Sequence, residues 1–132
     1  MNITTFDFGN GPVPAHKHAY GGGWVADTAK VADTVYVASD AKVFDNAQVF
    51  DNAWVYGNAE VFENARVFGN ALVYDNAWVC SDAVVSGTAR VYGNTQVCSD
   101  AVVSGDARAS NDAEEDMFIE MNGKRYKLVE VE

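Results

Sequence analysis

Basic residues, cysteines and histidines are scarce in this sequence. Of its 132 residues, only 9 are lysine or arginine against 19 aspartate or glutamate, so the formal net charge is −10. A protein that follows nucleic-acid phosphates, or that anchors to a membrane through a polybasic segment, needs the opposite balance. The composition therefore argues against long nucleic acid and anionic membranes as partners.

Two further absences narrow the class of protein. The chain has 2 cysteines, too few for a disulfide framework or a zinc cluster. It has no run of apolar residues long enough to span a membrane, and residues 1–5 lack the charged and apolar regions of a signal peptide. We therefore expect one soluble domain in the cytoplasm.

A six-residue repeat organises residues 25–108, which divide into 14 units without insertion or deletion. Every unit begins with valine, and its fifth residue is alanine in twelve units, the exceptions being Val35 and Thr95. A period of six fits no amphipathic helix, whereas Ala-x-Val followed by two polar residues is typical of a short strand and a corner. Corner pairs such as Asp45-Asn46 consist of residues that tolerate a left-handed backbone or bond to their own backbone.

A second period, three hexads long, indicates how the strands stack. Residues 79–90 return at 97–108 with one change, Asp106 in the place of Thr88. Three units therefore close one triangular coil, and the repeat makes about 4.7 coils with strands roughly 4.8 Å apart. Valine and alanine point inward and form a continuous apolar column. Cys80 and Cys98 stack one coil apart, close enough in principle for a disulfide, but we expect an intracellular pair to be reduced.

With these hexads the chain resembles the hexapeptide-repeat proteins, over about two-thirds of its length. The resemblance implies an all-β, left-handed parallel β-helix shaped as a triangular prism, and a homotrimer with parallel axes. We expect an N-terminal cap at 1–24, the β-helix at 25–112 and a C-terminal β-hairpin at 113–132. The hairpin turn is Asn122-Gly123, which favours type I′, and the hairpin caps the helix or reaches a neighbouring subunit.

Stacking with a period of three hexads assigns the outward side chains to three flat faces. The three sets are Trp24, Lys42, Phe44, Glu60, Phe62, Trp78, Cys80 and Cys98; Gln48, Phe50, Arg66, Phe68, Val84 and Val102; and Tyr36, Trp54, Tyr56, Leu72, Tyr74, Arg90, Tyr92 and Arg108. Columns of exposed aromatics exceed what a soluble monomer normally shows, which favours burial in a homotrimer or a multiple of three. The alternative is cross-strand stacking on an exposed sheet, which contributes about 0.2–1 kcal/mol per pair. Ten of the eleven acids in 25–108 lie at corners, where they serve as turn residues.

Many proteins of the family that this chain resembles are acyltransferases, in which an ejected loop carries a catalytic histidine and acyl-CoA lies between subunits. The unbroken repeat leaves no such loop here. The two histidines, His16 and His18, lie in the N-terminal segment, where they could act as a general base or as half of a metal site. With only Asp7 nearby in the sequence, we expect no catalytic residue, no metal and no cofactor.

The sequence leaves three functions open. The segment from Phe8 to His16, followed by Gly-Gly-Gly-Trp-Val, resembles short phage and prophage hexapeptide-repeat proteins, which implies a viral protein in the host cytoplasm. Such a protein could sequester a small nucleotide-like signalling molecule in intersubunit grooves, with arginines on phosphate and aromatic rings on bases. The candidate ligand-binding residues are Trp54, Tyr56, Arg66, Tyr74, Arg90, Tyr92, Arg108, His16 and His18. The same residues could instead be dry trimer contacts, and the alternative functions are an acyl-CoA-dependent acyltransferase and a structural trimeric module.

Overall fold

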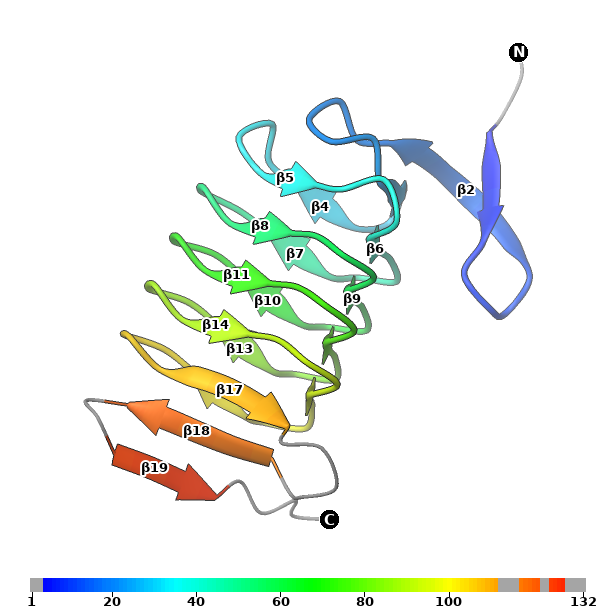
Figure 1. The fold of residues 1–132 in the computed structure, drawn as a ribbon. Helices are drawn as coiled ribbons and strands as arrows, with labels where there is room; N and C mark the ends of the chain where they lie inside the picture. Colours follow the sequence, from blue (N-terminus) through cyan, green and yellow to red (C-terminus); the bar gives the residue numbers. More distant parts are fainter. Residues whose placement is uncertain (1–3, 112–116, 122–123, 128–132) are drawn as a thin grey trace.

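The computed structural model describes residues 4–111, 117–121 and 124–127, which form a parallel β-solenoid (Figure 1). All regular structure in these residues is β-strand. Most strands of the coils are two residues long and join the sixth residue of one hexad to the valine of the next, as in β8 (Trp54–Val55) and β11 (Leu72–Val73). The predicted all-β class and the strand-and-corner unit are confirmed.

Strands three hexads apart pair in parallel and make three sheets. Sheet 1 contains β1 (Thr5–Asp7), β2 (Pro12–Lys17), β3 (Trp24–Ala26), β6 (Lys42–Val43), β9 (Glu60–Val61), β12 (Trp78–Val79) and β15 (Gln96–Val97). Sheet 2 contains β4 (Lys30–Val31), β7 (Gln48–Val49), β10 (Arg66–Val67), β13 (Val84–Val85) and β16 (Val102–Val103). Sheet 3 contains β5 (Tyr36–Val37), β8, β11, β14 (Arg90–Val91), β17 (Arg108–Asn111), β18 (Met117–Met121) and β19 (Lys124–Lys127). The sheets match the three predicted faces, and the left-handed sense of the coil stays a prediction of the resemblance.

The core is a column of valine and alanine along the solenoid axis. From Val37 to Val91 every inward valine and alanine is fully buried, which contributes roughly 1.5–3 kcal/mol per valine. Three inward positions differ from the others, and Ala101, near the C-terminal end of the repeat, is one that stays partly exposed. Val31, in the first coil, stays partly exposed, and Thr95 stands fully buried in the alanine column.

The corners turn through left-handed backbone, as their residue types predict. The φ angle is 58° at Asp45 and 64° at Gly57. A Cβ on Gly57 would lie 2.8 Å from the backbone nitrogen of Asp75 in the next coil, so glycine is needed there. Corner carboxylates also bond to the next coil: Asp45 Oδ2 accepts from the Glu63 N–H at 3.2 Å, and Glu63 Oε1 accepts from the Ser81 N–H at 2.8 Å.

The N-terminal segment continues sheet 1 beyond the first coil. Strands β1 and β2 form an antiparallel hairpin, and β2 pairs with β3, so the hairpin projects along the sheet (Figure 1). This pairing satisfies backbone groups at the edge of β3, which would otherwise stay open. The hairpin also lengthens an aromatic column, because Phe6 stacks on Trp24 at 4.7 Å and Phe8 stacks on Phe44 at 4.7 Å.

The C-terminal segment extends sheet 3 in the same manner. β18 pairs antiparallel with β17, and β19 pairs antiparallel with β18. The register of Met121 with Lys124 leaves a two-residue connection, as the predicted hairpin requires. The type of its turn, at 122–123, lies outside the described residues. Within the described residues, sheet 2 has no hairpin added to it.

Candidate ligand-binding site

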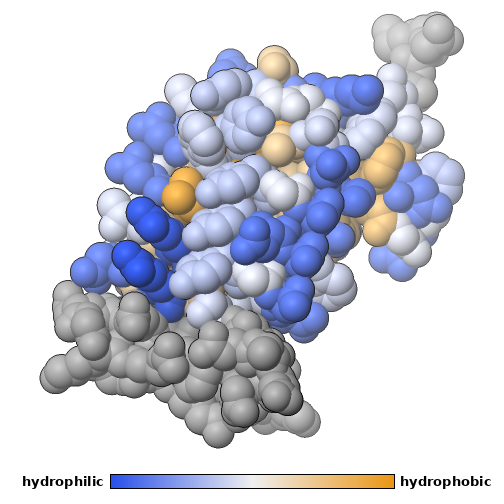
Figure 2. Space-filling view, viewed as in Figure 1, coloured by the Kyte–Doolittle hydropathy of each residue, from blue (hydrophilic) through white to orange (hydrophobic). Residues whose placement is uncertain are grey.

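Sheet 3 carries a ladder of three stacked tyrosines, Tyr56, Tyr74 and Tyr92, one coil apart. The ring centroids are 4.9 Å apart for the first pair and 5.2 Å for the second, and the ring planes differ by 5° and 8°. Identical residues in register on neighbouring strands give this arrangement. Figure 2 views this side of the solenoid, where pale, weakly polar side chains run along the axis between strongly hydrophilic ones.

The other outward column of sheet 3 changes from aromatic to cationic along the axis. Its members lie in register on successive strands: Trp54, Leu72, Arg90 and Arg108. Trp54 is 41% exposed, and its ring meets Tyr56 edge-on at 6.0 Å. Alternate residues of a strand project from the same side, so Arg90 shares a face with Tyr92. The structure thus places six of the predicted site residues on one sheet.

Stacking decides which ring faces a ligand can reach. Tyr74 is covered on both faces by the other two rings of the ladder. One coil before Tyr56 lies Ala38, and one coil after Tyr92 lies Ser110, both with small side chains. Neither face of the Tyr74 ring is therefore free for the predicted stacking of a planar ligand.

Burial and neighbouring charges raise the pKa values of Tyr56 and Tyr74. Burial is the largest cause that raises the pKa of Tyr56, followed by the Asp75 carboxylate. Burial also raises the pKa of Tyr74 most, and the adjacent tyrosines add to it. The Arg90 charge lowers the pKa of both tyrosines and so offsets part of this rise. The phenols are therefore hydrogen-bond donors at neutral pH.

Three predicted site residues lie elsewhere. Arg66 belongs to β10, on sheet 2. His16 is exposed, and its Nδ1 lies 2.7 Å from Asp27 Oδ1. His18 is buried, and its Nε2 donates to the Val35 carbonyl oxygen at 2.7 Å. The two histidines thus bond to different groups, and His18 has a structural contact.

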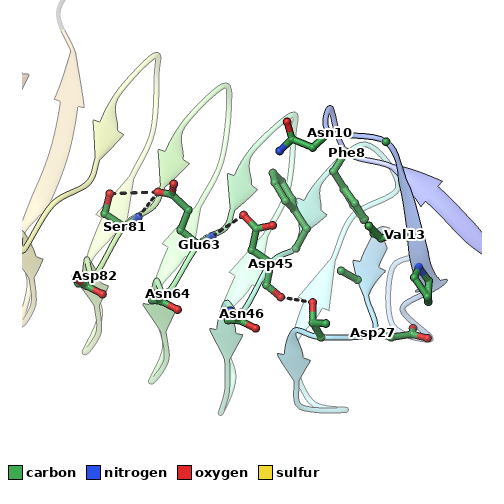
Figure 3. A pocket seen from close by; sticks show the side chains of 15 residues that line it. Phe8, Asn10, Val13, Asp27, Asp45, Asn46, Glu63, Asn64, Ser81 and Asp82 are labelled. Carbon is green, nitrogen blue, oxygen red and sulfur yellow. Dashed lines mark hydrogen bonds between the residues drawn. The ribbon is translucent and has the colours of Figure 1, made fainter.

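A groove of about 740 Å³ runs along the corner between sheets 1 and 2 (Figure 3). Phe8 and Val13 of the N-terminal hairpin form its apolar end (Figure 3), and Phe44, which also lines the groove, stacks on Phe8. Corner residues of four successive coils form most of the remaining wall: Asp27, Thr28, Asp45, Asn46, Glu63, Asn64, Ser81 and Asp82.

The groove is acidic. Four of its lining residues are carboxylates, and none is lysine or arginine. Two of the carboxylates, Asp45 and Glu63, already accept backbone N–H groups of the next coil, and Asp27 is paired with His16. Sequence reasoning missed this groove because it assigned the corner acids to turns. The hairpin that closes one end could not be placed from the repeat.

Comparison with known protein families supports the solenoid repeat. The family model described as YdcK beta solenoid repeat matches residues 65–81, a stretch of about one coil. No curated protein and no solved structure matches the chain. The fold is a parallel β-solenoid of the hexapeptide-repeat type. A β-solenoid is compatible with a non-enzymatic protein and with an acyltransferase-like hexapeptide-repeat enzyme.

The solenoid contains a disulfide between Cys80 and Cys98, which corrects the expectation that both are reduced. The two residues occupy the same hexad position on adjacent coils of sheet 1, and their Cα atoms are 4.6 Å apart. This distance is within the range that a disulfide spans. The expectation was wrong because it rested on the cellular compartment, whereas strand register brings the two side chains together.

The described residues contain neither a metal-binding cluster nor a membrane-spanning helix. Across residues 4–111, 117–121 and 124–127, no group of three or more histidine, cysteine, aspartate or glutamate side chains could hold a metal ion. The described part of the chain contains no helix long and apolar enough to cross a membrane.

Proposed function

We propose that the solenoid is a non-catalytic, homotrimeric binding protein that holds a small nucleotide-like molecule against sheet 3. The observation that carries this proposal is the tyrosine ladder beside Arg90 and Arg108. Aromatic rings bind planar ligands, and guanidinium groups bind phosphate. The resemblance of the N-terminal segment to phage proteins extends the proposal to sequestration of a signalling nucleotide in a host cytoplasm.

Local charge supports an anionic ligand. The chain as a whole carries a formal charge of −10, yet the outward positions of sheet 3 from Tyr36 to Ser110 contain no carboxylate. Arg90 and Arg108 lie on adjacent strands of that sheet. An anion on this face therefore meets less repulsion than the net charge of the chain implies.

Apolar exposure supports a homotrimer. Val102 on sheet 2 is 58% exposed, and Phe50, Phe68 and Val84 share its face. These side chains are wholly apolar. Packing them against a second copy of the chain would remove their apolar surface from water, which is favourable. With neither described hairpin on this sheet, we assign the subunit interface to sheet 2.

A second candidate, an acyltransferase, has one observation in its favour. His16 and Asp27 form a pair at 2.7 Å, and a carboxylate on Nδ1 orients a histidine to act as a general base through Nε2. The adjacent groove argues against it, because four carboxylates would repel the phosphates of acyl-CoA. We expect that acetyl-CoA does not bind to the protein. We also expect wild type and His16→Ala to give the same background rate in an assay of acetyl-CoA turnover. Acetyl-CoA turnover that His16→Ala abolishes would establish the enzyme instead.

Native mass spectrometry tests assembly and ligand together. We expect a mass of three times the 14.3 kDa chain, with additional retained mass after gentle purification from cells. Val102→Glu should give monomers, whereas Gln96→Glu, an exposed change on sheet 1, should leave the trimer intact. A wild-type monomer would refute the trimer. A trimer that neither retains a small molecule nor binds added nucleotides would refute the binding function and favour the structural module.

A further inference from the structure

The groove between sheets 1 and 2 is apolar at the hairpin end. Phe8, Val13 and Pro14 of the N-terminal segment line this end, and Val13 is 38% exposed. The ring of Phe44 stacks on that of Phe8, with the centroids 4.7 Å apart. A ligand that enters the groove therefore meets apolar side chains of the hairpin as well as polar side chains of the corner.

The corner side of the groove carries one carboxylate in each of four successive coils. These are Asp27, Asp45, Glu63 and Asp82. The other two corners of the solenoid include uncharged pairs, such as Gly57-Asn58 and Gly69-Asn70. Gly57 turns with a φ angle of 64°, close to the 58° of Asp45, so the turn itself does not require a carboxylate. An acid in every coil of this corner is therefore more than the backbone needs.

The carboxylates follow the spacing of the coils. The Cα atoms of Cys80 and Cys98, at equivalent positions of adjacent coils, are 4.6 Å apart. Asp45 and Glu63 also occupy equivalent positions of adjacent coils and lie in one row along the corner (Figure 3). Hydrogen bonds from the next coil hold Asp45 Oδ2 and Glu63 Oε1. Among the described residues no donor reaches the second oxygens, Asp45 Oδ1 and Glu63 Oε2, which leaves them to accept from a ligand.

A row of negative charges beside apolar surface suits a linear polyamine. Its ammonium groups stay protonated at neutral pH, as that of lysine does, and short methylene chains separate them. Three methylene groups between two nitrogens span about 5 Å when extended, which is close to the coil spacing. An extended basic peptide fits this spacing less well, because its side chains recur on one side about every 6.6–7 Å.

The groove has the size and the access that such a ligand needs. Its volume of about 740 Å³ lies within the usual range of small-molecule sites. None of its lining residues belongs to a strand of sheet 2, so assembly through that sheet does not use them. A cleft lined by one sign of charge beside apolar walls concentrates counter-ions.

We propose that this groove binds a linear polyamine, which lies along the corner. Its ammonium groups pair with Asp45 and Glu63, and its methylene groups contact Phe8 and Val13. This site is separate from the proposed nucleotide site on sheet 3, and its ligand has the opposite charge.

Isothermal titration calorimetry with spermidine, near physiological ionic strength, tests the site. Asp45→Asn and Glu63→Gln each remove one charge from the groove and keep an oxygen that accepts from the next coil. Asp51→Asn is the matched control, because Asp51 lies at another corner and its Oδ2 accepts from the Gly69 N–H at 3.0 Å. We expect each groove variant to weaken binding about threefold, the double variant about tenfold, and the control to stay within about 1.5-fold of wild type.

A second pair of measurements separates the apolar contact from charge. Val13→Thr keeps the branched shape and replaces a methyl group by a hydroxyl, so it should weaken spermidine binding about twofold. Magnesium ions, which have charge but no methylene groups, should bind more weakly than spermidine and equally to wild type and Val13→Thr. Circular dichroism shows that each variant is folded. If Asp45→Asn does not fold, the comparison of Glu63→Gln with Asp51→Asn decides.

Three results would overturn the polyamine site, and each leaves the nucleotide proposal standing. The first is a folded wild-type protein that does not bind spermidine. The second is an equal loss of binding in Asp45→Asn and Asp51→Asn, which would mean that spermidine responds only to the net charge of the chain. The third is a magnesium ion or a lysine tetrapeptide that binds more tightly than spermidine, because the spacing argument would then select the wrong class of cation.

Discussion

Replacing Thr95 by valine should make the solenoid more stable. Thr95 is fully buried in the alanine column, and its Oγ1 has no hydrogen-bond partner among the described residues. A buried hydroxyl left without a partner costs about 1–3 kcal/mol, and valine keeps the branched shape without that hydroxyl. Val35 occupies the same hexad position and is fully buried, so the core already accommodates valine at such a position.

We expect Thr95→Val to raise the free energy of unfolding by about 1–2 kcal/mol and Tm by roughly 3–6 °C. Thr95→Ser is the control, because it keeps the hydroxyl and loses a methyl group, which should cost about 1 kcal/mol. Urea unfolding followed by circular dichroism measures the free energy of unfolding of both variants and of wild type. All samples are kept at one protein concentration, because assembly of the chains adds to the apparent stability. If the valine variant is no more stable than wild type, the Thr95 hydroxyl is satisfied and the reasoning is refuted.

Three further predictions concern the disulfide, the ladder and a corner. Replacing both cysteines by serine should lower the free energy of unfolding by about 3 kcal/mol, because a disulfide between positions 18 apart in the sequence restricts the unfolded chain. A reductant should therefore destabilise wild type but not the serine variant, and an equal effect of the reductant on both proteins would refute this prediction. The raised pKa values of Tyr56 and Tyr74 mean that the folded state holds its phenolic protons longer than the unfolded state, so their contribution is fully present below pH 10 and is lost as pH rises further. Thermal unfolding from pH 8 to 11 should show this loss, and changing both tyrosines to phenylalanine should reduce it. Gly57→Ala should destabilise the solenoid by about 1–3 kcal/mol and more than Gly105→Ala, whose Cβ meets no atom within 4 Å; equal effects would mean that backbone strain alone matters.

The coil, its three sheets and its core could be predicted from the sequence because each follows from a single period. A valine every sixth residue fixes the inward direction, and the repetition of residues 79–90 at 97–108 fixes the strand register. Register then assigns every outward residue to a sheet. The tyrosine ladder was therefore visible as a column before its ring geometry was known.

Two kinds of feature could not be predicted: contacts made by segments outside the repeat, and the chemical state of residues inside it. The N-terminal hairpin has no hexads, so its pairing with β3 and its closure of the acidic groove follow from tertiary contacts of Phe6 and Phe8. The strand register shows that the tyrosines share a column, but it does not give the distances and angles between their rings. The state of the cysteines was misjudged because compartment was given more weight than register.

Many backbone N–H groups in the coils donate to the coil that follows, as the Trp54 N–H does to the Ala71 carbonyl oxygen, whereas others, such as the Ala53 N–H, bond within their own coil. Such a chain can change length in two ways with different results. Loss of three consecutive hexads removes one strand from each sheet and leaves every later side chain on its original sheet. Loss of a single hexad keeps valine in the core but transfers every later side chain to the neighbouring sheet, so that Tyr92 would leave the column of Tyr56. An insertion or deletion of one hexad therefore preserves the inward valine pattern and moves later side chains to another sheet, whereas the gain or loss of a whole coil preserves both the pattern and the sheet of every remaining side chain.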